Sequence, residues 1–272
     1  MSIVARAFLS LLFLCSLWAV AADKRPPKAS HFPPALSIGW QDLHHGIGTA
    51  PVAFDIAPDG SRLAVEFWVL EDAPPNTSVE IWLAVWDLST KQQLQAAPVD
   101  GPFTTHELEN PQIRYDVRFS PDSHLVVQTG LRVRVLTADG LQPIYSIAPS
   151  EDLSKTKYGP VIRNFSLSSD ARRIAVLSDS LVENRPRSAI TVLDLLSGER
   201  LYTWNTEPHI SQVTLSPDGN VVLLNELSAN RLTARSSADG KVLHSWNENL
   251  EPPVFTSATE LAGMPSIRTD AS

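Results

Sequence analysis

A turn motif that recurs four times along the chain limits its fold more than any other feature of the sequence. The copies read FDIAPDG, VRFSPDS, FSLSSDA and VTLSPDG, and their aligned aspartates, at intervals of 63, 48 and 48 residues, are Asp59, Asp122, Asp170 and Asp218. Each copy starts with alternating apolar and polar residues, the two-residue period of a half-buried strand. Proline, aspartate and glycine then favour a tight turn. The motif therefore predicts a strand and a hairpin turn that repeat along the chain.

Three further strands are expected after the first strand of each copy. A second apolar run follows each turn directly, and a third strand is expected at 81–88, 133–136, 190–195 and 232–235. A fourth strand is clearest in the last two copies, which read LYTWN and VLHSWN. Four antiparallel strands in about 45 residues form one blade of a β-propeller. The predicted fold class is all-β, a β-propeller-like array of about four four-stranded antiparallel blades near 52–97, 115–147, 161–204 and 211–246.

The repeats also resemble a known group of sequences. A turn of the FSPDG type, a short strand and a segment of the form IxVxDLxSG are similar to the WD40-like and YVTN-type β-propeller repeats of exported bacterial proteins. The best match is 165–204, where ITVLDL is followed by Ser197 and Gly198, and the resemblance extends over about 52–246. Trp86-Asp87 is the only Trp-Asp pair, and no copy has the Gly-His pair of strict WD40 repeats. The resemblance therefore implies the broad superfamily and its fold.

The number of repeats leaves the closure of the propeller open. Four blades are the lower limit for propellers. The chain could form a closed ring of four blades, or a half ring that a second copy completes as a homodimer. A fifth blade could also come from 36–47 together with the C-terminal tail, because SIGWQDL at 37–43 alternates like a strand. We favour an incomplete propeller, which either dimerises or is shortened relative to its relatives.

The N-terminus indicates export from the cytoplasm. Arg6 is followed by the apolar run AFLSLLFLCSLWAV and by small residues, the order that is typical of a secretory signal peptide. We expect a signal peptide at 1–22, with Ala19-Val20-Ala21 as the cleavage motif, and a periplasmic or secreted mature protein. An uncleaved membrane anchor is the alternative, but the run is shorter than the roughly 20 residues that span a bilayer. No stable membrane span is expected after cleavage.

The remaining chain is expected to contain one folded domain between two extended ends. A linker with four prolines is predicted at 23–35, the propeller repeats at 36–250, and a flexible tail at 251–272. The single cysteine, Cys15, lies in the signal peptide, so stability must come from packing without disulfides. The net charge of −8 argues against nucleic acid as a partner.

Loop lengths predict where a binding surface would lie. In a blade, the loops from strand two to strand three, and from strand four to the next blade, emerge on one face, and the Asp-Gly turns emerge on the other. We name the first of these the long-loop face, because the long connections at 71–79, 96–111, 148–159 and 179–187 belong to it. Long loops often carry function. The binding-face candidates in them are His106, Glu107, Glu109, Asp152, Lys155, Tyr158 and Arg185.

The function expected from these features is that of a noncatalytic extracytoplasmic binding or scaffold protein, which holds a protein or another macromolecule on the long-loop face. No catalytic or cofactor motif appears, and we expect no cofactor. The alternative is a lactonase-like propeller hydrolase with a metal site on the propeller axis. Residues at the start of the first strands would surround that axis, and they are Pro51-Val52, Tyr115-Asp116, Arg163-Asn164 and Ser211-Gln212. Of these, Asp116 and Asn164 could coordinate a cation.

Overall fold

The computed structural model describes residues 48–70, 78–104, 114–148, 161–182, 185–206, 210–226, 229–247, 250–255 and 261–265. All of them belong to one compact unit, Ile38–Ser272. The expected signal peptide, the linker and the strand predicted at 37–43 lie outside the described residues. In the part of the chain that is described, no helix has the length and apolar character needed to cross a membrane.

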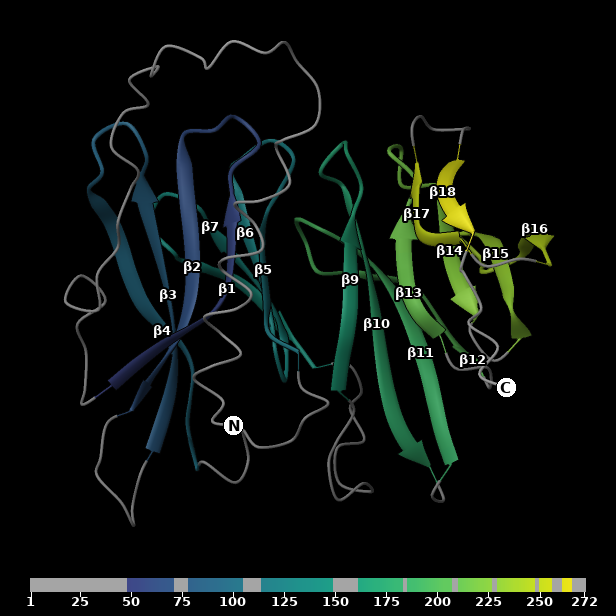
Figure 1. Cartoon of the computed structure of the whole chain (residues 1–272), viewed down its shortest axis with the longest axis horizontal. Coiled ribbons are helices and arrows are strands. Elements are labelled where there is room, and N and C mark those ends of the chain that lie inside the picture. Colours follow the sequence, from purple (N-terminus) through teal and green to yellow (C-terminus); the bar gives the residue numbers. More distant parts are fainter. Residues whose placement is uncertain are drawn as a thin grey trace, which may run out of the picture. The chain divides into compact units, whose positions relative to one another are not determined.

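The first two repeats each form a four-stranded antiparallel sheet (Figure 1). The first sheet contains β1 (Gly48–Ile56), β2 (Arg62–Leu70), β3 (Ser78–Asp87) and β4 (Gln93–Thr104). The second sheet contains β5 (Asp116–Phe119), β6 (Leu125–Thr129), β7 (Val133–Thr137) and β8 (Pro143–Ile147). In both sheets the strands pair in chain order, so each repeat is a meander.

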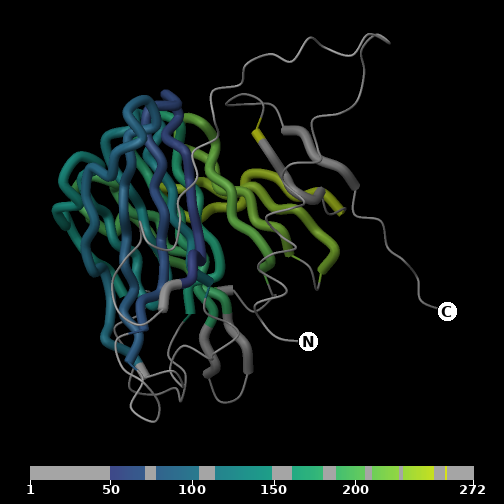
Figure 2. Tube along the Cα trace, turned by 60° about the vertical axis from the view of Figure 1, so that its left-hand side comes forward, coloured from purple at the N-terminus to yellow at the C-terminus, as the bar shows by residue number. Residues whose placement is uncertain are grey.

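The last two repeats have the same topology, and Figure 2 traces the succession of sheets from purple to yellow-green. The third sheet contains β9 (Val161–Leu167), β10 (Arg173–Val182), β11 (Arg185–Asp194) and β12 (Arg200–Thr206). The fourth contains β13 (Ile210–Leu215), β14 (Val221–Glu226), β15 (Arg231–Ser236) and β16 (Val242–Trp246). The predicted all-β, propeller-like array of four four-stranded antiparallel blades is therefore confirmed.

The C-terminal segment differs from the expected flexible tail. It contains β17 (Leu250–Phe255) and β18 (Leu261–Pro265), which pair as a two-stranded antiparallel sheet. Phe255 packs against the buried residues Leu223 and Leu232 of the fourth sheet. Pro252 and Pro253 interrupt the apolar alternation and the backbone donors of β17, so the sequence lacks the usual signal of a strand there.

The repeated motif folds as a turn that is held by its own side chains. In the fourth repeat, Ser216 Oγ donates to Asp218 Oδ1 at 2.6 Å, and Val221 N donates to Ser216 Oγ at 2.9 Å. Gly219 has a φ of 70°, the left-handed conformation that glycine adopts without strain. The same serine and aspartate pairing occurs at Ser168 and Asp170, where the distance is 2.6 Å. These contacts explain why the motif recurs as a unit.

Apolar clusters between successive sheets form the core. Leu83 and Val85 of the first sheet pack with Val117 and Phe119 of the second. Further clusters lie between the second and third sheets and between the third and fourth. The core is therefore built from sheet-to-sheet layers, the packing expected of propeller blades.

An arginine at the start of the second strand adds a polar contact at two of these three interfaces. Arg62 Nη2 donates to the carbonyl oxygen of Ser123, in the turn of the second sheet, at 2.7 Å. Arg173 Nη1 donates to the equivalent carbonyl oxygen of Gly219, in the turn of the fourth sheet, at 2.9 Å. Leu125 stands at the corresponding position of the second sheet. The interface between the second and third sheets therefore lacks this arginine.

Candidate functional site

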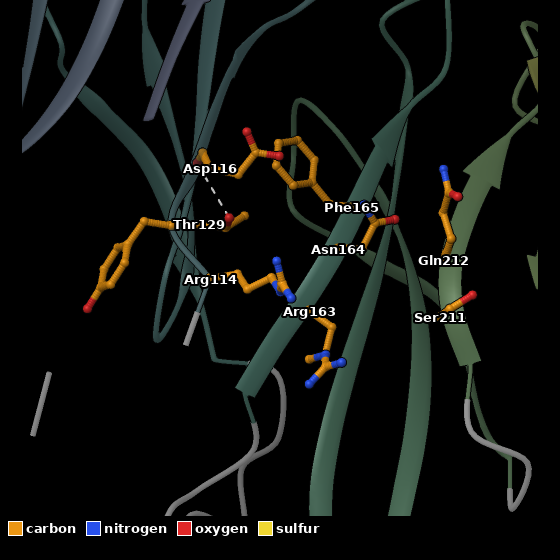
Figure 3. Close-up of a pocket in the computed structure, with 9 residues that line it drawn as sticks. Arg114, Asp116, Thr129, Arg163, Asn164, Phe165, Ser211 and Gln212 are labelled. Carbon is orange, nitrogen blue, oxygen red and sulfur yellow. Dashed lines mark hydrogen bonds between the residues drawn. The ribbon is translucent and has the colours of Figure 1, made fainter. Parts of the chain in front are cut away.

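A pocket of about 480 Å³ lies where the first strands of the second, third and fourth sheets begin (Figure 3). Its lining residues are Arg114, Tyr115, Asp116, Thr129, Arg163, Asn164, Phe165, Ser211 and Gln212. All of them except Thr129, which ends β6, lie just before or within β5, β9 and β13. The connections from fourth strands to first strands enter here, so the pocket is on the long-loop face.

A side-chain hydrogen bond links the first strands of the first and second sheets, and another links those of the third and fourth sheets, but the first strands of the second and third sheets lack this bond in the described part of the chain. Asp55 Oδ2 of β1 accepts a hydrogen bond from Phe119 N of β5 at 2.8 Å. Ser166 Oγ of β9 accepts one from Leu215 N of β13 at 3.0 Å. The equivalent residue of β5 is Arg118, which cannot accept such a bond. Among the described residues, no side chain of β5 holds the backbone of β9 in this way.

Arg118 instead contacts its neighbours through its guanidinium group. Its Nη2 donates to Asp116 Oδ2 at 2.8 Å, and its Nε donates to the same oxygen at 3.1 Å. The guanidinium carbon lies 4.8 Å from the ring centroid of Phe165, a distance typical of a cation–π contact. Arg118 thus links the second and third sheets and neutralises the carboxylate of Asp116 at the edge of the pocket.

Two other arginines supply positive charge to the pocket. Arg163 Nε lies 3.6 Å from Asp179 Oδ2, and Asp179 Oδ1 also accepts a 2.7 Å hydrogen bond from Ser188 Oγ. Arg114 is exposed and has no ion-pair partner in the described part of the chain. Figure 3 shows the Arg114 side chain in the space between β5 and β9, and the Arg163 side chain extending from β9 on the side of β10.

The side-chain amide of Asn164 is oriented by a hydrogen bond with the backbone of Val213. Its Oδ1 accepts a hydrogen bond from Val213 N of β13 at 3.1 Å. Because the oxygen is held in this way, the amide nitrogen is the end of the side chain that remains as a donor. Asn164 therefore joins the third and fourth sheets and also offers a hydrogen-bond donor to the pocket.

A buried polar network lies beside the pocket, between the first and second sheets. Glu66 is fully buried and accepts a 2.9 Å hydrogen bond from Gln128 Nε2, and Arg134 Nη1 donates to Gln128 Oε1 at 3.1 Å. Burial raises the pKa of Glu66 well above its ordinary value. Tyr115 packs edge-on against Trp68, and burial also raises the pKa of its hydroxyl.

The structure places some of the predicted site residues and leaves others undescribed. Asp116 and Asn164, which were expected to lie near one axis, line the same pocket. Arg185 begins β11 with Val182 as its cross-strand partner, and its side chain is not described. The other binding-face candidates lie outside the described residues, namely His106, Glu107, Glu109, Asp152, Lys155 and Tyr158.

Sequence reasoning missed three of the lining residues, Arg114, Thr129 and Phe165. Arg114 directly precedes the segment where the first strand was expected, and Thr129 ends the apolar run of a second strand. The signal that could have identified them is the equivalence of the repeats, because the starts of first strands and the ends of second strands meet on one face.

Two of the oxygen atoms expected to coordinate a cation have protein partners. Asp116 Oδ2 accepts from Arg118, and Asn164 Oδ1 accepts from the backbone of Val213. Within the described ranges there is no group of three or more His, Cys, Asp or Glu residues that could hold a metal ion. Arginine donors therefore dominate the chemistry of this pocket.

Comparisons with known proteins found similar solved structures only. No family model and no curated protein matches the chain. The chain is similar to Kuenenia stuttgartiensis hydrazine synthase, with 15% identity, a TM-score of 0.42 and coverage of 69% of this chain and 63% of that one. It is also similar to the Pan2 WD40 domain of Neurospora crassa, with 12% identity, a TM-score of 0.44 and coverage of 73% of this chain and 50% of that one. A chain of the mitotic checkpoint complex has 12% identity, a TM-score of 0.47 and coverage of 74% of this chain and 55% of that one. The chain thus spans between 50% and 63% of the length of these structures.

Proposed function

We propose that this protein is a noncatalytic binding or scaffold protein that holds a protein or another macromolecule on the long-loop face. The observation that carries the proposal is the pocket to which three successive sheets contribute. The segments 105–113 and 149–160 run directly into the residues around this pocket, and they contain most of the binding-face candidates.

The proposed location is the periplasm or the cell exterior, and the proposed relationship is to the exported WD40-like and YVTN-type propeller proteins. The support is the signal-like sequence at 1–22 and the repeat pattern of the chain. Fractionation of the source cells, with N-terminal sequencing of the protein, tests the location. An N-terminus at residue 22 or 23 in the extracytoplasmic fraction supports it, and an intact leader in the cytoplasm contradicts it.

Binding can be tested by crosslinking the protein in the extracytoplasmic fraction, identifying the partner and measuring its affinity with purified components. The long-loop face is altered by Arg114→Gln combined with Gln212→Ala. The matched control is Arg200→Gln, because Arg200 is exposed and follows the Ser197-Gly198 turn on the opposite face. Weaker binding by the first variant alone supports the proposal. The absence of any direct partner, or equal binding by all variants, overturns it.

A lactonase-like hydrolase with an axial metal is the second candidate. The observation in its favour is that Asp116 and Asn164 line one pocket. Asp116 Oδ2 is paired with Arg118, so a metal would be coordinated through Oδ1 or would displace Arg118 from Oδ2. Metal analysis of the purified protein, with and without Asp116→Ala, is decisive. Bound metal that the substitution removes supports the hydrolase, and protein without bound metal ends that proposal.

A homodimer is proposed from two apolar side chains on the first sheet. Phe54 and Ile56 are 53% and 52% exposed, but the equivalent residues of the second sheet, Val117 and Phe119, are 0% and 3% exposed. In the second sheet these positions pack against the preceding sheet. A sheet from a second copy of the chain would cover the first sheet in the same way.

A further inference from the structure

We infer that the pocket binds a carboxylate group, with Arg114 and Arg163 as the residues that contact it. This inference rests on the proposed binding function and names the chemistry of its ligand. The two arginines come from different sheets and line the same pocket (Figure 3). Arginine presents paired N–H donors in a planar fork that matches the two oxygens of a carboxylate.

The charges around the pocket select an anion. Asp116 is paired with Arg118, and Arg163 lies near Asp179. Arg114 has no ion-pair partner among the described residues, and it brings a further positive charge to the pocket. This charge stands out because the whole chain has a net charge of −8. A ligand with one negative group would offset the positive charge of Arg114.

A carboxylate fits this balance better than a phosphate. A phosphate dianion carries two negative charges, but of the two arginines that line the pocket Arg163 already lies near the carboxylate of Asp179. A carboxylate carries one charge and accepts from the arginine forks in the plane of its oxygens. The amide nitrogen of Asn164 supplies a further donor, because Val213 holds the amide oxygen. The pocket therefore offers donors to both oxygens of a carboxylate.

The volume of the pocket suits a small acid or the side chain of an acidic peptide. About 480 Å³ is within the range of small-molecule sites, roughly 300–1,000 Å³. The carboxylate could thus belong to a free dicarboxylic acid or to an acidic segment of the macromolecular partner. Both sources would place the same group between Arg114 and Arg163.

Isothermal titration of the purified protein tests the inference with four probes, which are succinate, succinamide, inorganic phosphate and an acetylated tetraglutamate peptide. We expect binding of succinate, of the peptide or of both, with little binding of succinamide and weaker binding of phosphate. Binding of succinate identifies a free acid as a suitable ligand, and binding of the peptide alone identifies an acidic segment.

Substitutions then locate the bound carboxylate. Arg114→Gln and Arg163→Gln should each raise the Kd of the binding probe at least about tenfold, because a charge-assisted hydrogen bond is lost. Arg114→Lys should retain part of the affinity, and Arg200→Gln should leave it unchanged. Thermal denaturation confirms that each variant is folded. Arg163→Gln could weaken the fold because it removes the contact with Asp179. Arg114 is exposed and has no ion-pair partner in the described ranges, so Arg114→Gln keeps the test valid.

Three results would overturn the inference. The first is that neither carboxylate probe binds. The second is that the arginine variants bind the probe as tightly as the parent protein does. The third is that succinamide or phosphate binds as tightly as the carboxylate probes. If a macromolecular partner still binds the long-loop face in those cases, the carboxylate inference fails and the binding function stands. If carboxylate binds as expected but no partner is found, the proposed function fails and the pocket chemistry stands.

Discussion

Asn164 of β9 binds the backbone of Val213 in β13, with 3.1 Å between its Oδ1 and the amide nitrogen. Val213 is buried, so its N–H group has little access to water. The bond joins two first strands and leaves the amide nitrogen as the donor of a side chain that lines the pocket. A single side chain therefore joins the packing of the sheets to the geometry of the candidate site.

Removing this acceptor should destabilise the protein. Asn164→Ala leaves the Val213 N–H without a partner, and an unsatisfied buried donor costs about 1–3 kcal/mol of unfolding free energy. Asn164→Asp keeps an acceptor oxygen and should lose less. Urea denaturation measures both values. Equal stability of Asn164→Ala and the parent protein would show that the bond does not hold the two sheets.

Two glycines allow the packing of a turn to be separated from its backbone conformation. Gly60 and Gly219 have φ values of 72° and 70°, so alanine would cost about 1–2 kcal/mol at either position. A Cβ atom at Gly219 would lie 3.2 Å from Ser168 Cβ and 3.0 Å from Arg173 Cδ, but at Gly60 nothing lies within 4 Å. Gly219→Ala should therefore be the more destabilising substitution in urea denaturation. Equal losses would mean that the third and fourth sheets do not approach closely at this turn.

Much of the fold could be predicted because each repeat combines a strand period with a turn that its own side chains stabilise. The pairing of Ser216 and Asp218 is local, so the sequence alone indicates it. The strand at Leu250–Phe255 was missed because it depends on packing of Phe255 against the fourth sheet and its prolines conceal the period. Short-range patterns are visible in a sequence, and contacts between repeats are visible only in part.

The candidate site was predictable only where the repeats are equivalent. Asp116 and Asn164 occupy matching positions in their repeats, so they could be expected to lie together. The role of Arg118 could not be expected, because it depends on Phe165 in the next sheet. Glu66 was also missed, although a carboxylate within the apolar run AVEFWVL is unusual and could have indicated a buried polar network.

The buried carboxyl group of Glu66 should make stability depend on pH. Burial raises its folded-state pKa, so the folded protein retains this proton after the unfolded chain has lost it. The stability that the protonated form contributes is complete below the unfolded-state pKa and is lost as pH rises toward the folded-state pKa. Glu66→Gln should remove this loss and raise stability at pH 7 relative to the parent protein.

Urea denaturation of Glu66→Gln and of the parent between pH 4 and pH 8 checks this prediction. The difference in unfolding free energy should grow with pH in favour of the variant. Glu199→Gln is the control, because Glu199 is exposed and should leave the pH profile unchanged. Parallel profiles for Glu66→Gln and the parent protein would contradict a proton held on Glu66.

The exposed apolar pair on the first sheet predicts concentration-dependent association. If a second copy covers Phe54 and Ile56, light scattering should give the mass of a dimer, and Phe54→Ser combined with Ile56→Ser should shift the mass to that of a monomer. Leu196→Ser is the control, because Leu196 is also an exposed apolar residue but lies in a turn of the third sheet. A monomeric parent protein at high concentration would contradict the homodimer.

Amide hydrogen exchange with the bound macromolecular partner tests the binding function most directly. The account predicts slower exchange at 114–116, 161–164 and 210–212, where the three first strands surround the pocket, and unchanged exchange at the turns 58–61, 121–124, 169–172 and 217–220. Protection of those turns without protection of the strand starts would place the binding surface on the opposite face and contradict the account.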